Sequence, residues 1–215
     1  MSAGHNIMHS AASLATVAII GTALLAGVDF LTAERIAAQE RRVVLEQLGQ
    51  IVNPERYDNL LQEDLFTVRD AAHFPPGQDV TVYRARKDGK PVAVVMKLAA
   101  VNGYNGLIHL LVGINADGSL SGVRVTAHKE TPGLGDAIEI EKSDWVLGFS
   151  GSSLQSPSAK GWAVRRDGGV FDQFTGATIT PRAVVEAVRL ALEYFEHNSA
   201  FLFAAPAQNT SSEKM

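Results

Sequence analysis

The hydrophobic and polar positions follow three different patterns along this chain. Residues 11–31 are almost continuously apolar, and Asp29 is the one charged residue among them. From residue 32 to 76, apolar residues recur with helical spacing between charged ones. From 79 to 126, apolar and polar residues alternate, which is typical of strands. The pattern therefore predicts an apolar N-terminal helix, a helical connection and then a sheet.

The connection at 32–76 is expected to contain two helices. The first covers residues 32–52 and ends at Asn53-Pro54, because proline lacks the N–H that a helix interior needs. A second, short helix is predicted around residues 57–65. The Phe74-Pro75-Pro76-Gly77 group then marks a loop, after which the strand pattern begins.

The strand pattern predicts an antiparallel sheet built from local hairpins. Strands are expected at residues 80–85, 92–99, 107–114 and 120–125, and the Asp88-Gly89 pair predicts the turn of the first hairpin. The run at 107–114 is apolar at nearly every position, which indicates a strand buried on both faces.

After the sheet, the sequence predicts one more strand and one long helix. The strand is expected at residues 162–164. The helix is amphipathic, with Thr180 as its N-cap and Pro181 at its first position, and it is expected to close at Asn198-Ser199-Ala200. Residues 201–215 are expected to form a short apolar hook and a disordered tail.

These elements predict an α+β protein: one N-terminal transmembrane helix, followed by a domain in which helices pack against an antiparallel sheet. The expected parts are a short N-terminal segment (1–10), the transmembrane anchor (11–31), the helical connection (32–76), the α+β domain (77–200) and the C-terminal tail (201–215).

The segment at 11–31 is just long enough to cross a bilayer, which takes about 20 apolar residues in a helix. The alternative is a cleaved signal peptide, but such a peptide normally begins with basic residues, and residues 1–10 contain no Lys or Arg. A retained single-span anchor is therefore predicted. Arg35, Arg41 and Arg42 follow the segment, so the positive-inside rule taken literally places the domain in the cytoplasm. Glutamates alternate with these arginines and weaken the rule here.

The composition excludes several classes of function. The chain of 215 residues has a net charge of −4 and no cluster of Lys and Arg, which argues against nucleic acid as a partner. Cysteine is absent, so disulfides, cysteine-ligated iron–sulfur clusters and thiol-linked flavins are ruled out. The six histidines have no ligand spacing, and no metal site is expected. No nucleophile elbow or Ser-His-Asp order is present, so no catalytic residue is assigned.

The stretch from Asp172 to Pro181 combines a glycine turn with the start of the long helix. Gly176 and Ala177 leave the backbone uncrowded, and the hydroxyl of Thr178 stands beside them. A helix N-terminus presents unpaired N–H groups and a partial positive charge, so the loop suits a phosphate. The same residues also fit a capped turn that binds nothing.

A second glycine loop follows the sheet at His128-Lys129-Glu130-Thr131-Pro132-Gly133-Leu134-Gly135-Asp136. Glycines in a Pro-Gly-x-Gly loop allow the backbone to approach a ligand or another segment closely. By itself this loop is a weak signal, because glycines in such loops usually only allow the chain to turn.

The two loops together resemble a known family. The pattern Asp-x-x-Ser/Thr-Gly-Ala-Thr-x-Thr at 172–180 is similar to the flavinylation motif of the FMN-binding domain family, with Thr175 where many members have Ser. The resemblance implies that Thr178 carries FMN through a phosphoester bond. It also implies a cofactor site that contains Asp172, Thr175, Gly176, Ala177, Thr180, Glu130, Thr131, Gly133, Leu134 and Gly135.

The loop at 128–135 resembles two sets of flavoproteins: the G subunits of Rnf electron transport complexes and the C subunits of sodium-pumping NADH:quinone oxidoreductases. Lys129 and Asp136 favour the Rnf set. The resemblance implies a covalent FMN, other membrane subunits as partners, and a flavin transferase for maturation. It also implies a single-pass protein of the bacterial inner membrane with its domain in the periplasm, within ferredoxin and NAD chemistry coupled to ion movement.

Some alternatives stay open at this point. Tyr104 could stack on a planar ligand, although such a residue more often covers a sheet edge. Arg165 and Arg166 could face a phosphate, but an exposed charged turn is the preferred interpretation. A membrane-anchored module that binds without redox chemistry is the alternative from a different class of function.

Overall fold

The computed structural model describes the backbone of residues 2–204 and the side chains of residues 14–16, 18–33 and 46–204. The chain forms two compact units, one up to residue 46 and one from residue 47 onward. The predicted disordered tail beyond residue 204 lies outside the described residues.

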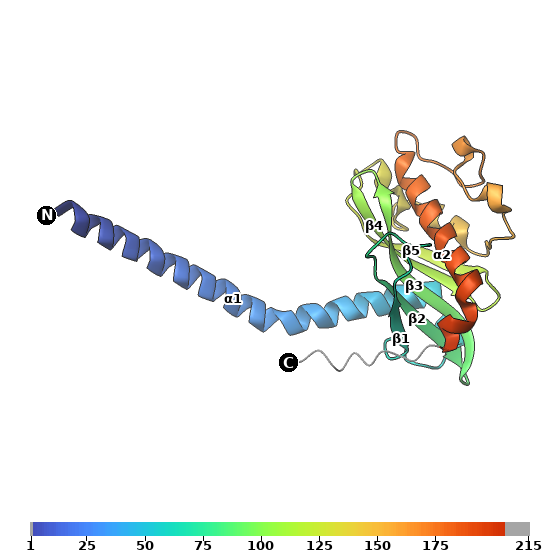
Figure 1. Cartoon of the computed structure of the whole chain (residues 1–215), viewed down its shortest axis with the longest axis horizontal. Coiled ribbons are helices and arrows are strands. Elements are labelled where there is room, and N and C mark those ends of the chain that lie inside the picture. Colours follow the sequence, from blue (N-terminus) through green and yellow to red (C-terminus); the bar gives the residue numbers. More distant parts are fainter. Residues whose placement is uncertain (1, 205–215) are drawn as a thin grey trace. The chain divides into compact units, whose positions relative to one another are not determined.

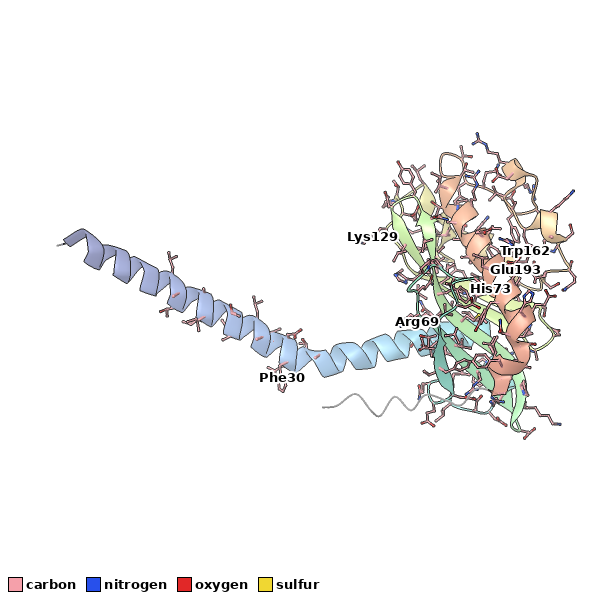
Figure 2. The ribbon with its side chains drawn as sticks, in the orientation of Figure 1. Phe30, Arg69, His73, Lys129, Trp162 and Glu193 are labelled. Carbon is pink, nitrogen blue, oxygen red and sulfur yellow. The ribbon has the colours of Figure 1, made fainter. Side chains whose placement is uncertain are left out.

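The N-terminal unit consists of most of helix α1 (Ser2–Ile51). Its stretch Leu14–Ala33 is long and apolar enough to cross a membrane. The large apolar side chains that the structure describes there are exposed, and Phe30, 84% exposed, projects from the helix in Figure 2. The predicted N-terminal helix is confirmed, and it continues without a break into the predicted helix at 32–52.

The second unit contains a five-stranded antiparallel sheet whose strands lie in chain order (Figure 1). They are β1 (Leu65–Val68), β2 (Val80–Lys87), β3 (Lys90–Gly103), β4 (Gly106–Asn115) and β5 (Leu120–Ala127). The predicted strands correspond to β2–β5, so the antiparallel sheet is confirmed. The Asp88-Gly89 turn is confirmed as well: both residues have positive φ, as the type I′ turn of a two-residue hairpin requires.

The predicted short helix at 57–65 is wrong. That segment forms turns and then strand β1. The reason is a set of contacts to β2, which lies far away in sequence: Asn59 accepts the amide of Arg86 at 2.8 Å and donates to the carbonyl of Arg84 at 2.9 Å. Asp64 pairs with the guanidinium groups of both arginines. These contacts tie the segment along the sheet edge in place of a helix.

Helix α2 (Ile179–Ala204) lies across one face of the sheet, as Figure 1 shows. The core between them is formed by alternate residues of the strands and by one side of the helix, including Met96, Leu110, Val112, Val184, Val188 and Leu192.

Residues at the end of α1 cover the opposite face of the sheet. There Gly113 allows close packing, because a Cβ at that position would lie 2.2 Å from Cγ2 of Ile51. Leu110 and Leu111, which point to opposite faces, are both fully buried. The prediction that this strand is buried on both faces is therefore confirmed.

Two predicted ends differ from the structure. Helix α2 continues to Ala204, because Phe201 packs edge-on against Phe66 and Leu202 is fully buried, so residues beyond 200 gain contacts by staying helical. The predicted strand at 162–164 is reduced to a single bridge between Val164 and Phe171.

Short 3₁₀ helices lie between these elements within the described residues. They are η1 (Pro54–Arg56), η2 (Gly135–Ile138), η3 (Asp144–Phe149), η4 (Ala159–Gly161) and η5 (Arg165–Asp167).

Two leucines of β4 test the position of the core. Leu110 is fully buried and Leu107 is 49% exposed. Because truncation of a buried leucine removes apolar contacts and leaves a cavity, Leu110→Ala should lower the free energy of unfolding by about 2–5 kcal/mol. The matched variant Leu107→Ala should change it by about 0.5 kcal/mol or less. Denaturant unfolding of the full chain in detergent, followed by tryptophan fluorescence, measures both. Equal losses in the two variants would contradict this assignment of the core.

Candidate functional site

A cavity of about 560 Å³ opens where the β3–β4 hairpin, the loop after β5 and the start of α2 meet. Its volume lies within the range of about 300–1,000 Å³ usual for small-molecule sites. A second hollow of about 480 Å³, beside Lys87 and Asp117 at the opposite end of the sheet, holds none of the predicted site residues. The first cavity is therefore the candidate site. It is lined by Tyr104, Glu130, Thr131, Leu134, Gly135, Arg166, Gly176, Ala177, Thr178, Ile179 and Thr180.

A tight turn presents Thr178 at the edge of the cavity. The amide of Ala177 donates to the carbonyl of Phe174 at 3.1 Å, and Gly176, the third residue of this turn, has a φ of +84°. A type II turn requires such a φ, and glycine adopts it without a steric penalty. The carbonyl of Thr178 accepts the amide of Arg182 at 3.4 Å. Thr178 therefore directly precedes α2, at the end of the helix that carries the partial positive charge.

Thr180 does not cap the helix, contrary to the prediction. Helix α2 begins at Ile179, so Thr180 and Pro181 both lie inside its first turn. Thr180 is fully buried and donates its hydroxyl to Oε2 of Glu130. The proline still fits, because the N–H groups of the first turn have no partner within the helix.

The carboxylate of Glu130 joins three parts of the cavity wall. Glu130 is 5% exposed, and its carboxylate accepts a hydrogen bond from the hydroxyl of Thr180 in α2. Its other oxygen accepts the amide of Asn105, at the tip of the β3–β4 hairpin, at 3.1 Å. The side chain of Asn105 in turn donates to the Thr131 hydroxyl at 3.3 Å. The hairpin, the loop after β5 and the helix are thus held together around one buried acid.

Gly135 leaves the space that this arrangement needs. A Cβ on Gly135 would lie 2.9 Å from Cβ of Glu130 and 3.0 Å from Oγ1 of Thr180. Real Cβ atoms essentially never come within 3.0 Å of such a neighbour, so the contact with Glu130 would force a shift, and the one with Thr180 would be unusually tight. Glycine at this position is therefore explained by the close approach of the loop to the helix.

His128 supports Glu130 through the backbone. Its Nδ1 accepts the amide of Glu130 at 3.0 Å, so the ring carries its proton on Nε2, which donates to Glu139 at 2.5 Å. Both ring nitrogens are engaged in this way. Across the part of the chain that the structure describes, no group of three acidic or histidine side chains is placed to hold a metal ion.

The loop before Thr178 rests on Trp145. The indole N–H donates to the carbonyl of Asp172 at 2.7 Å, and the ring packs edge-on against Phe174 with 5.2 Å between ring centroids. The carboxylate of Asp172 pairs with Arg165 at 3.0 Å. These contacts fix the path of the chain into the turn that presents Thr178.

The short 3₁₀ helix η5, called the η5 turn below, carries further charges beside the cavity. Arg182 of α2 donates two hydrogen bonds to Asp167, at 2.7 and 3.0 Å. These bonds hold the pKa of the Asp167 carboxyl below its usual value, and they raise the pKa of Arg182. The turn is thereby tied to the first residues of the helix.

Most of the predicted site residues converge on this one cavity, although the two loops lie about fifty positions apart in sequence. Gly133, Asp172 and Thr175 do not line it, and all three are exposed. The structure adds residues that the sequence analysis left outside the site: Tyr104, Arg166 and Ile179. Tyr104 and Arg166 had a signal in the sequence, namely flanking glycines and neighbouring charge, whereas Ile179 had none.

Family models match most of this chain. Residues 103–193 match the FMN-binding domain model, a range that contains every residue lining the cavity. Residues 1–51 match the model of the RnfG N-terminal region. The fold and the site therefore belong to the class of FMN-binding domains.

Curated relatives extend over nearly the whole chain. A protein from Pseudoalteromonas atlantica is 47% identical over 192 residues, which cover 89% of each chain. One from Shewanella loihica is 46% identical and covers 94% of this chain and 95% of its own length. One from Vibrio cholerae is 45% identical, covering 90% and 92%. All three are named as the G subunit of an ion-translocating oxidoreductase complex, and this chain belongs to that family, the G subunits of Rnf complexes.

The space at Gly135 gives a direct test of the site. Gly135→Ala should destabilise the protein by about 1–3 kcal/mol, because the new methyl group must displace Glu130 or Thr180. Gly148→Ala is the matched control, since a Cβ there meets nothing within 4 Å. Denaturant unfolding of the full chain in detergent compares the two variants. An unfolding free energy that is unchanged in Gly135→Ala would contradict the close contact.

Proposed function

We propose that this chain is the membrane-anchored flavoprotein component of an Rnf-type electron transport complex and carries electrons on an FMN joined covalently to Thr178. The observation that carries the proposal is the position of Thr178 at both the cavity edge and the start of α2. The first N–H groups of a helix lack partners, and together with the helix dipole they favour a bound phosphate.

The rest of the wall suits a flavin. Tyr104, Leu134 and Ile179 line the cavity and are 65%, 45% and 44% exposed. Apolar side chains left exposed around a cavity are typical of a ligand site, and flat rings pack well on them. Glu130 and Gly135 would keep this wall in place. The bound flavin supplies the redox chemistry, and the chain contributes binding and orientation.

Attachment needs a separate enzyme. A threonine hydroxyl is a poor nucleophile without an adjacent base. Glu130 already accepts bonds from Thr180 and Asn105, and Asp172 pairs with Arg165 outside the cavity lining. Neither carboxylate is placed to take the proton of Thr178.

We therefore propose a flavin transferase that uses FAD. The Thr178 oxygen forms a bond to the phosphorus on the flavin side, the pyrophosphate bond breaks, AMP leaves, and the hydroxyl proton passes to a base of the transferase. Asp172, Gly176, Ala177 and Thr178 would form its recognition site. Asp172 and Gly176 are exposed, and Ala177 and Thr178 are half-buried, so the motif is reachable from solvent.

The proposed partners are the other membrane subunits of the complex, within ferredoxin and NAD chemistry coupled to ion movement. The proposed location is the bacterial inner membrane, with a single span and the domain on the periplasmic side. The apolar stretch Leu14–Ala33 supports the span, because its large described side chains are exposed within their own unit. A covalent cofactor also suits the periplasm, where dissociated FMN would be lost.

Intact mass tests the attachment. The full chain co-expressed with a flavin transferase should gain the mass of one FMN less water. Thr178→Ala should show no gain while it keeps its fold, and Thr178→Ser should keep the gain because it retains a hydroxyl. Covalent flavin on Thr178→Ala would overturn the assignment. No gain in the parent protein would favour an anchored module that binds without redox chemistry.

The absence of cysteine allows a clean test of topology. A single cysteine introduced by Lys160→Cys, at an exposed position of the domain, should react with a membrane-impermeant maleimide in intact spheroplasts. A cysteine introduced by Ser2→Cys should react only after the membrane is opened. The reverse result would place the domain in the cytoplasm, as the positive-inside rule alone suggests.

A further inference from the structure

The η5 turn places Arg166 at the cavity with its backbone fixed on both sides. The amide of Arg166 donates to the side chain of Gln173 at 3.2 Å, and the amide of Arg165 donates to the carbonyl of Phe171 at 2.7 Å. Gly169 packs against Ala163 so closely that a Cβ there would lie 1.8 Å from the Ala163 carbonyl oxygen. The turn therefore has a defined position beside the loop that leads to Thr178.

The charges of this turn are paired on either side of Arg166. Arg165 pairs with Asp172 at 3.0 Å, and Asp167 receives two hydrogen bonds from Arg182. Arg166 lines the cavity, and within the described part of the chain its guanidinium makes no hydrogen bond or ion pair. Its charge also acts on Asp167, but more weakly than that of Arg182, which already occupies this carboxylate.

The cavity therefore has one cation in its wall that forms no ion pair with a carboxylate of the described residues. The acid that also lines it, Glu130, is turned to Asn105 and Thr180. A ligand with a single negative charge near Thr178 would complement this arrangement. A phosphate joined to both a threonine and a flavin has one such charge, and the planar guanidinium offers several N–H donors to its oxygens.

We propose that Arg166 binds the phosphodiester that links the flavin to Thr178. This inference rests on the proposed function and adds a residue to it. Arg166 would fix the phosphate end of the cofactor, so that the apolar wall has only to orient the rings. It would also make the empty site selective for flavin mononucleotide over riboflavin, which lacks the phosphate.

Binding of free flavins to the full-length Thr178→Ala protein tests the selectivity. FMN should bind about five- to tenfold more tightly than riboflavin, because a charge-assisted hydrogen bond at an exposed arginine is partly screened by water. Adding Arg166→Gln should remove most of this preference and leave riboflavin binding unchanged. Arg166→Lys should restore part of it, and higher salt should reduce it in the parent.

Lys160→Gln is the matched control, since it removes one exposed charge of the same domain from a residue that does not line the cavity. A preference for FMN that survives Arg166→Gln, or that falls equally in Lys160→Gln, would overturn the role of Arg166. Should neither flavin bind the Thr178→Ala protein, the measurement on the loaded protein decides.

Phosphorus NMR of the flavin-loaded full chain is that measurement. Intact mass is recorded first on the same sample. The phosphodiester resonance should shift in Arg166→Gln and stay in place in Lys160→Gln. An unmoved resonance in a protein whose mass shows the flavin overturns the role of Arg166 and leaves the proposed function standing. A parent protein without the mass gain overturns the proposed function, and the ligand of Arg166 with it.

Discussion

The candidate site depends on one buried carboxylate. Glu130 follows the sheet, yet its oxygens accept bonds from the tip of the β3–β4 hairpin and from the first turn of α2. A buried carboxylate without hydrogen-bond partners is costly. Burial of Glu130 therefore favours the arrangement in which both the hairpin and the start of α2 donate to it. Gly135 and Gly103 leave room for it, since a Cβ on either would lie about 3 Å from a Glu130 atom. The shape of the cavity is therefore set by the need to satisfy one acid.

This arrangement separates rigidity from access. The acid, the buried Thr180 and the core side of α2 are inside the protein, whereas Thr178 stands half-buried at the rim. A residue at the start of a long helix is held by the packing of the whole helix, here by Val184 and Val188 against the sheet. Its hydroxyl can thus be positioned firmly and still be reached by another protein. A transferred group could not be delivered to Thr180, two residues away, because that hydroxyl is fully buried.

Local periodicity predicted the helices and strands that have a clear pattern in their own sequence. It failed for segments whose structure depends on contacts with residues far away in the chain. Strands β2–β5, α1 and α2 carry clear patterns. The structure of the segment at 57–65 depends on hydrogen bonds that join the side chains of Asn59 and Asp64 to β2, more than twenty positions away, and no local pattern reveals them.

The candidate site was also predicted only in part. The two loops were recognised from their motifs. Neither motif reveals the hydrogen bond between Glu130 and Thr180, which lie fifty positions apart. Because of this bond, Thr180 is a hydrogen-bond donor to Glu130 and not the N-cap of the helix.

The proposed covalent bond also explains why the cavity can be so sparsely charged. Once a cofactor is joined to Thr178, the site stays filled whatever the affinity of the cavity for the free cofactor. The side chains that line the cavity then need only favour one orientation of the cofactor. One cation and three partly exposed apolar side chains are enough for that purpose, whereas a freely exchanging site would need more buried contacts. The same exposure that would weaken a dissociable site would leave the edge of a flavin held there open to a redox partner. In this proposal the covalent link holds the cofactor in place, and the open wall of the cavity orients it.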